Sequence, residues 1–181
     1  MADNKPGFQV IEHEKIYQGR AFNVSRLLVK TPNGEARHYD LVDHPDSISI
    51  VPVDEEGCIW FVRQWRLGVD GDLLELPAGV LEPGEEPLPG AEREIREETG
   101  MAANEMTILG SYYLTPGYCN EYMTVFLARD LYPDPLDMDS DEYIDLVKIP
   151  FQKAFEMAEQ GQFYDSKTLA ALFLARPRLL G

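Results

Sequence analysis

The chain has 181 residues, of which 44% are hydrophobic, which is enough for one domain with a sizeable core and argues against disorder. Its formal net charge of −16, from 32 acidic and 16 basic residues, argues against non-specific binding to nucleic acid or anionic membranes, because both need basic patches. This charge still permits a phosphate substrate, since metal ions and a few placed arginines can reverse the sign locally.

Targeting signals are not apparent in the sequence. The first residues, MADNKPG, contain no apolar signal segment, and no uninterrupted apolar run approaches the length of a membrane helix. Cys58 and Cys119 are isolated, without CxxC spacing. We therefore expect a cytoplasmic protein in which both cysteines are ordinary buried thiols in a reducing environment.

The first 45 residues are predicted to form an antiparallel β-extension. Residues 21–31 alternate between apolar and polar side chains and end at the hairpin signal Pro32-Asn33-Gly34, and residues 37–42 would form the return strand. Such a unit is too small to be stable alone. It could be a lid on the core sheet or a dimerisation arm. We accordingly expect an extension, residues 1–45, and a main domain, residues 46–181.

The main domain is predicted to alternate strands with helices. Strands are expected at residues 47–53, 58–65, 73–76, 106–114, 122–128 and 143–149, and helices at residues 151–159 and 166–175. Residues 130–142 form an acidic loop with two prolines. This order predicts an α/β fold, an α/β/α sandwich around a mixed central sheet.

Residues 87–99 are predicted to form a further helix. Its two prolines fall in the first turn, where backbone N–H groups have no intrahelical partner, and Gly100 suits its end. Its apolar stripe at helical spacing consists of Leu88, Ala91 and Ile95.

Three carboxylates share one face of this helix. At about 100° per residue, Glu97 and Glu98 lie on either side of Glu94. Like charges four residues apart destabilise a helix by a few tenths of a kcal/mol, and a divalent cation would offset this. Carboxylate oxygens suit Mg²⁺, with Mn²⁺ as the other candidate. The alternative is a solvated acidic face. Arg93 stands four residues before Glu97 and can orient it through an ion pair.

Residues 79–101, GVLEPGEEPLPGAEREIREETGM, resemble the Nudix hydrolase signature Gx5Ex7REUxEExGU at every specified position. The resemblance implies the Nudix fold. It also implies Glu94 and Glu98 as main metal ligands and Glu97 as supporting ligand or base. Glu85 and Arg93 would orient the loop and the helix, and the carbonyl of Ala78 would be an extra ligand.

Other segments resemble the ADP-ribose pyrophosphatase group of that family. Pro116 stands fifteen residues beyond Met101, as in that group, although Pro116-Gly117 is also a turn signal. The other similar segments are residues 62–66, 75–79, 120–121 and 141–142. The resemblance implies that the substrate contacts include Glu75, Pro116, Gly117 and Glu121.

Arg63 and Arg66 should fall on opposite faces of an unbroken strand. Both are candidates for substrate binding, and we expect Arg66 to point at the diphosphate, because a guanidinium binds phosphate oxygens bidentately. The alternative is that both are edge-strand charges.

The acidic loop supplies a further candidate, Glu142. In the family, an acid from this loop swings to the metals or activates water, which implies Glu142 as base, ligand or both. Some members carry a second glutamate two residues earlier, where this chain has Ser140. Asp139 and Asp141 are weaker candidates, and a solvated loop acid is the alternative.

The resemblance implies Mg²⁺-dependent hydrolysis of a nucleoside diphosphate sugar, ADP-ribose first, giving AMP and ribose 5-phosphate. It further implies a homodimer through the N-terminal sheet. Adenine would stack there on an aromatic, for which Tyr17, Phe22 and Tyr39 are available; plain sheet packing is the alternative for each. The alternative substrates are ADP-glucose, GDP-mannose and a flavin dinucleotide, and a non-hydrolysing ligand-binding module is the alternative class.

Overall fold

The computed structural model describes residues 7–138 and 143–181, which belong to two compact units. The first unit comprises Met1–Pro45 and Tyr113–Glu121, and the second comprises Asp46–Tyr112 and Tyr122–Gly181. The expected division at residue 45 had placed Tyr113–Glu121 in the main domain. The backbone of Val42 explains the difference, because its N–H donates to the carbonyl of Tyr118 at 2.7 Å and its carbonyl accepts from Asn120 N–H at 3.2 Å.

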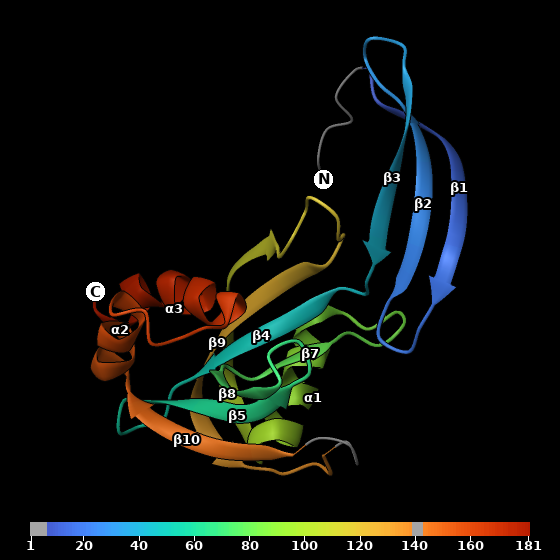
Figure 1. Cartoon of the computed structure of the whole chain (residues 1–181). Coiled ribbons are helices and arrows are strands. Elements are labelled where there is room, and N and C mark those ends of the chain that lie inside the picture. The colour runs from blue at the N-terminus through green and yellow to red at the C-terminus, as the bar shows by residue number, and fades with distance from the viewer. Residues whose placement is uncertain (1–6, 139–142) are drawn as a thin grey trace. The chain divides into compact units, whose positions relative to one another are not determined.

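The first unit is built on a three-stranded antiparallel sheet of order β1-β2-β3 (Figure 1). Its strands are β1 (Gln9–Gln18), β2 (Asn23–Lys30) and β3 (Ala36–Asp43). The predicted hairpin turn is confirmed: Gly34 has φ +86° and its N–H donates to the carbonyl of Thr31 at 2.9 Å. All ten residues of the edge strand β1 are exposed, apolar ones included, and such an edge is a template for pairing with another chain.

The second unit contains two sheets. A mixed sheet of order β7-β4-β9-β8 has β4 parallel to β9 and antiparallel to β7. Its strands are β4 (Ser47–Pro52), β7 (Ala78–Val80), β8 (Met101–Tyr113) and β9 (Tyr122–Pro133). An antiparallel sheet of order β10-β5-β6 has the strands β5 (Cys58–Arg66), β6 (Gly71–Glu75) and β10 (Ile144–Pro150).

Strands β8 and β9 are longer than predicted. β8 begins five residues before the expected residue 106, and β9 runs to Pro133 in what was expected to be loop. Side chains of the two strands meet there, as Asn104 Nδ2 donates to Asp130 Oδ2 at 2.8 Å. These polar extensions form strands because each pairs with the other. The alternation of apolar and polar residues within one segment does not show which strand it will pair with, so the extensions were not predicted.

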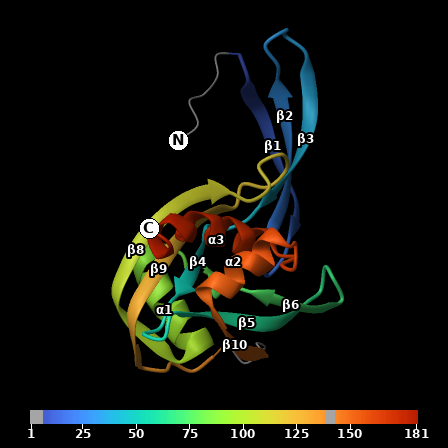
Figure 2. The same ribbon diagram turned by 90° about the vertical axis from the view of Figure 1, so that its left-hand side faces the viewer.

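Helices cover both faces of the mixed sheet. Helix α1 (Pro87–Thr99) contacts one face of β4 and α3 (Ser166–Leu179) the other, with α2 (Phe151–Glu159) beside α3 (Figures 1 and 2). Every residue of β4 is therefore buried. Ile48 and Ile50 of β4 pack in one core cluster with Ala91 and Ile95 of α1. The expected α/β/α architecture is confirmed.

One detail of the predicted helix 87–99 is wrong. Its bounds agree with the structure, but Leu88 does not belong to the buried stripe, because it is 43% exposed. The stripe begins at Ala91, one turn further on, where the helix meets the sheet.

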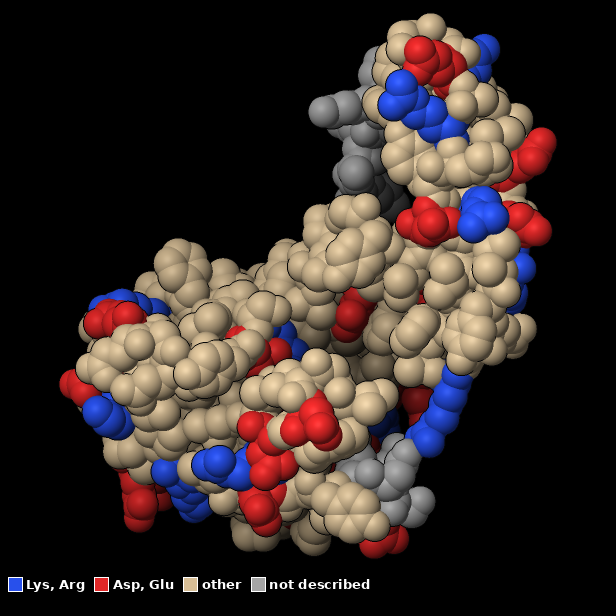
Figure 3. Space-filling model, viewed as in Figure 1, with Lys and Arg blue, Asp and Glu red and all other residues tan. Residues whose placement is uncertain are grey.

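Acidic and basic side chains are interspersed on one face of the molecule (Figure 3). On the face drawn in Figure 3, acidic side chains lie at many separate places and basic ones lie among them. Within residues 7–138 and 143–181, none of the helices is long and apolar enough to cross a membrane.

Candidate active site

Helix α1 is fixed at both ends by local sequence. Prolines occupy its first turn, where they cost no backbone hydrogen bond. Gly100 closes it in the left-handed conformation at φ 71°, and the N–H of Gly100 donates to the carbonyl of Arg96 at 3.1 Å. The glutamates in the second half of the helix are thereby held in a defined orientation.

Two of these glutamates are buried against the first residues of strand β7. Glu94 is 8% and Glu98 3% exposed, whereas Glu97 is half-buried. Glu98 Oε2 accepts the N–H of Ala78 at 3.0 Å. A Cβ on Gly79 would lie 1.8 Å from Oε1 of Glu94, so that carboxylate packs directly on the backbone of β7. The structure therefore brings Ala78, Glu94 and Glu98 together through the N–H of Ala78 and the backbone of Gly79, and their roles as metal ligands stay predictions.

Arg93 is the common partner of three signature carboxylates, those of Glu85, Glu94 and Glu97. Its Nε and Nη2 donate to the two oxygens of Glu85 at 3.1 and 2.9 Å, while Nη1 donates to Glu94 at 2.7 Å and to Glu97 at 2.8 Å. The predicted ion pair between Arg93 and Glu97 is confirmed. The hydrogen bonds from Arg93 hold the pKa of the Glu85 carboxyl below its usual range. The hydrogen bonds to Glu85, Glu94 and Glu97 in turn raise the pKa of Arg93.

Arg66 belongs to a second ion-pair network in the same unit. Its Nε and Nη2 donate to the two oxygens of Glu75 at 2.9 and 2.7 Å, and Lys167 also donates to Glu75 Oε2. Burial by itself would raise the pKa of Glu75, but the hydrogen bonds from Arg66 and the charge of Lys167 outweigh it, and the pKa is lowered. Glu75 raises the pKa of Arg66, with a smaller contribution from the charge of Glu98.

No local pattern in the sequence indicates Lys167. It contacts Glu75, which is 92 residues away in the chain, and no spacing rule connects such positions. Asp165 could have been found, since it precedes an apolar helix and caps it by accepting the N–H of Thr168 at 2.9 Å.

Arg63 lies on the opposite side of β5 from Arg66, as the strand alternation predicts. Strand β5 pairs without a break with β6 and β10. Arg63 is exposed and lines a shallow hollow with the neighbouring Trp65, Tyr143 and Asp145. Its role in substrate binding stays a prediction.

The remaining substrate candidates with described positions belong to the first unit. The rings of Tyr17 and Phe22 are 6.3 Å apart and both are exposed, and Tyr39 is exposed on β3. Pro116 and Gly117 are exposed in the loop that follows β8. Glu121 is largely buried, with an oxygen 3.8 Å from Nδ1 of His44. Their roles stay predictions. Glu142, Ser140, Asp139 and Asp141 lie outside the described residues.

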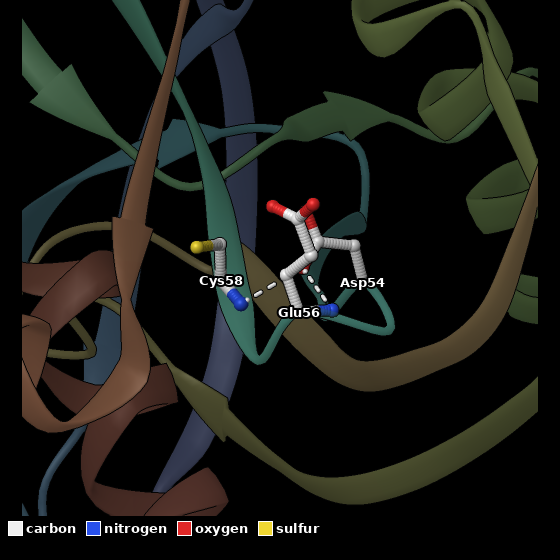
Figure 4. Close-up of side chains that lie close together, drawn as sticks. All are labelled: Asp54, Glu56 and Cys58. Carbon is white, nitrogen blue, oxygen red and sulfur yellow. Dashed lines mark hydrogen bonds between the residues drawn. The ribbon is translucent and has the colours of Figure 1, made fainter.

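A second group of possible ligands lies between β4 and β5. Asp54, Glu56 and Cys58 place one ligand atom each within 4.8 Å of one another (Figure 4), and no other described His, Cys, Asp or Glu residues gather so closely. Asp54 Oδ1 accepts the N–H groups of Glu56 at 3.1 Å and Cys58 at 2.9 Å, and Asp54 Oδ2 accepts the Trp60 indole N–H at 2.9 Å. These bonds close the turn 54–57, so we assign the group a structural role.

The groups around Glu94 and Glu98 fit a hard divalent cation. They are carboxylates and the backbone of Ala78, and Glu85, Glu94 and Glu97 share the single guanidinium of Arg93. Several carboxylates gathered on one helix face favour the binding of a cation. Mg²⁺ and Mn²⁺ prefer such oxygen donors.

Known proteins resemble this chain over most of its length. The NUDIX domain model matches residues 43–172. The chain is 34% identical to the ADP-ribose pyrophosphatase of Bacillus subtilis, covering 91% of this chain and 90% of that protein. It is 32% identical to the methanol dehydrogenase activator of Bacillus methanolicus, again covering 91% of this chain and 90% of that protein. The crystal structure of an ADP compounds hydrolase superposes with a TM-score of 0.86 at 29% identity, over 97% of this chain and 95% of the other.

Proposed function

This chain belongs to the NUDIX family and is a pyrophosphohydrolase, and we propose that it hydrolyses the diphosphate of a nucleoside diphosphate sugar, ADP-ribose first, to AMP and ribose 5-phosphate. The observation that carries the proposal is the packing of Glu94 and Glu98 against the backbone of Ala78 and Gly79. The names of the B. subtilis relative and of the structural neighbour support the choice of an ADP compound.

The reaction needs a divalent cation, which we propose is Mg²⁺. Glu94, Glu97, Glu98 and the carbonyl of Ala78 would hold it, with Glu142 as a further candidate. When bound, it neutralises phosphate charge and makes a bound water more acidic. The proton of the attacking water goes to a carboxylate, for which Glu97 and Glu142 are the candidates.

The other residues bind and orient. Arg93 holds Glu94 and Glu97 from one side, and Glu85 fixes Arg93 through both of its oxygens. Arg66 presents its charge near Glu98 and would bind a phosphate oxygen of the substrate. Such positioning by preorganised charges is a large part of phosphoryl-transfer catalysis.

We further propose that the enzyme is a cytoplasmic homodimer. The exposed edge strand β1 supports pairing between copies through the first unit. Cys119 is buried as expected, whereas Cys58 is only half-buried, and both are free thiols, which suits a reducing compartment.

A substrate panel tests the proposed function. The protein is incubated with Mg²⁺ and ADP-ribose, ADP-glucose, GDP-mannose or flavin adenine dinucleotide, and phosphate is measured after phosphatase addition. We expect the highest kcat/KM with ADP-ribose and no turnover in excess EDTA. A preference for GDP-mannose would make that compound the substrate in place of ADP-ribose. Tight binding without turnover of any compound would indicate a ligand-binding module.

The likeness to the methanol dehydrogenase activator favours a second candidate function, regulation of a partner dehydrogenase. The test is to add the protein to a purified methanol dehydrogenase and follow its rate. Stimulation that is lost in Glu98→Gln would support this role and tie it to the hydrolytic site, whereas an unchanged dehydrogenase rate would reject it.

A further inference from the structure

Glu75 is a buried carboxylate whose two oxygens are both engaged. It is 1% exposed and ends strand β6. Arg66 takes both oxygens, and Lys167 shares Oε2 with Arg66. Lys167 is 13% exposed and also pairs with Asp165 at 3.1 Å. The row Arg66, Glu75, Lys167 and Asp165 thus alternates in sign and has no net charge, which is how charges are tolerated in an interior.

These charged residues are connected to the segment between β6 and β7, which leads to the contact with the glutamates of α1. Leu76, directly after Glu75, donates its N–H to Oγ1 of Thr168 at 2.9 Å. The hydroxyl of Thr168 in turn donates to Asp165 at 2.6 Å. Two residues further on, Ala78 donates to Glu98. The first turn of α3 therefore holds one end of a short link whose other end contacts the proposed metal site.

Only part of the Arg66 guanidinium donates to Glu75. Its Nε and Nη2 face Glu75, and its side chain is 39% exposed, so its remaining N–H groups can reach a ligand. Their direction depends on the plane of the Glu75 carboxylate, because a bidentate pair is coplanar. Lys167 fixes that plane, since its ammonium holds Oε2 from the side of α3.

We propose that Lys167 is a positioning residue for the substrate diphosphate: through Glu75 it sets the direction in which Arg66 presents its free N–H groups. The proposal rests on the proposed hydrolysis of a nucleoside diphosphate. Lys167 itself is held between two carboxylates and is largely buried, so it acts through Arg66. Misplacing a binding group by a fraction of a bond length is costly when the geometry is preorganised.

The test measures steady-state kinetics with ADP-ribose and Mg²⁺. Lys167→Met keeps the length of the side chain and removes its charge; we expect KM to rise roughly fivefold to tenfold with kcat within about threefold, because Arg66 binds ground and transition state alike. Lys167→Arg should restore most of the loss. Lys153→Met, at an exposed lysine of α2, is the matched control and should leave KM unchanged. Circular dichroism checks the fold, and Lys167→Gln replaces the Met variant if that one unfolds.

A double-mutant cycle separates positioning from a general structural role. Arg66→Lys keeps the charge and loses the fork, so adding Lys167→Met should raise KM no further. An independent, multiplicative rise in the double variant would overturn the proposal, as would a wild-type KM in the folded Lys167→Met or Lys167→Gln protein, or a loss confined to kcat.

Equilibrium binding of ADP with Mg²⁺, followed by calorimetry, is measured beside the kinetics. If the wild type does not hydrolyse ADP-ribose, the proposed function fails, and weaker ADP binding by the Lys167→Met protein still supports the role of Lys167. If the wild type hydrolyses ADP-ribose and Lys167→Met binds ADP normally, the role of Lys167 fails alone.

Discussion

The carboxylate of Glu94 occupies the space that a side chain on Gly79 would need. A Cβ at Gly79 would lie 1.8 Å from Oε1 and 2.5 Å from Oε2 of Glu94. Gly79 is not among the residues with positive φ, so its requirement is one of space and not of backbone conformation. The first glycine of the signature is thus explained by the position of a proposed metal ligand.

Gly79→Ala should displace Glu94 and lower kcat by about tenfold or more, at a cost in stability of roughly 1–3 kcal/mol for overpacking. Gly68→Ala is the control, because a Cβ there meets nothing within 4 Å. Both proteins are assayed with ADP-ribose and melted by calorimetry. Normal turnover in Gly79→Ala would contradict the close packing of Glu94 on β7.

Glu94→Gln and Glu98→Gln should each lower kcat by at least ~10², because each removes negative charge at the proposed metal site. Glu92→Gln, an exposed position on the same helix, should be near wild type. Isothermal titration with Mn²⁺ measures metal affinity in the same proteins. Wild-type turnover of either variant at saturating Mg²⁺ would reject the assignment of these residues as ligands.

The ion pair of Glu85 with Arg93 should make stability depend on pH in the acidic range. Because Arg93 lowers the folded-state pKa of Glu85, the stabilisation is complete above the usual glutamate pKa of about 4.3 and is lost as the pH falls through the lower folded-state pKa. The Tm difference between wild type and Glu85→Gln should therefore be larger at pH 7 than at pH 3. Glu86→Gln, at an exposed neighbour, should show no such trend.

The proposed homodimer should be visible in solution. Light scattering at micromolar concentration should give about twice the chain mass of 20.5 kDa. Ile11→Asp places a charge on the exposed edge strand β1 and should shift the mass towards the monomer, while Glu14→Gln on the same strand should not. A monomeric wild type would exclude the dimer.

Glu142→Gln should lower kcat with little change in substrate Kd, since an acid from a closing loop acts on the rate more than on binding. Ser140→Ala should have a much smaller effect. Full activity of Glu142→Gln combined with an inactive Asp139 or Asp141 variant would place the base elsewhere in the loop. Activity of all three would point to Glu97.

The helix of the site is predictable from local sequence rules alone. The bounds 87–99, the prolines of the first turn, Gly100 at the end and the shared face of Glu94, Glu97 and Glu98 all follow from local rules of helix geometry and capping. These features depend on residues within a few positions of one another. The family signature, residues 79–101, contains the whole helix.

The contacts around that helix became visible only in the folded protein. The contacts of Glu98 with Ala78 and of Glu75 with Lys167 span 20 and 92 residues. The hydrogen bonds of Val42 with Tyr118 and Asn120, which join that segment to the first unit, span 76 and 78 residues. Such pairs arise when strands and helices pack, and their energy comes from burial and charge pairing between distant segments. No periodicity or spacing in a single sequence records them.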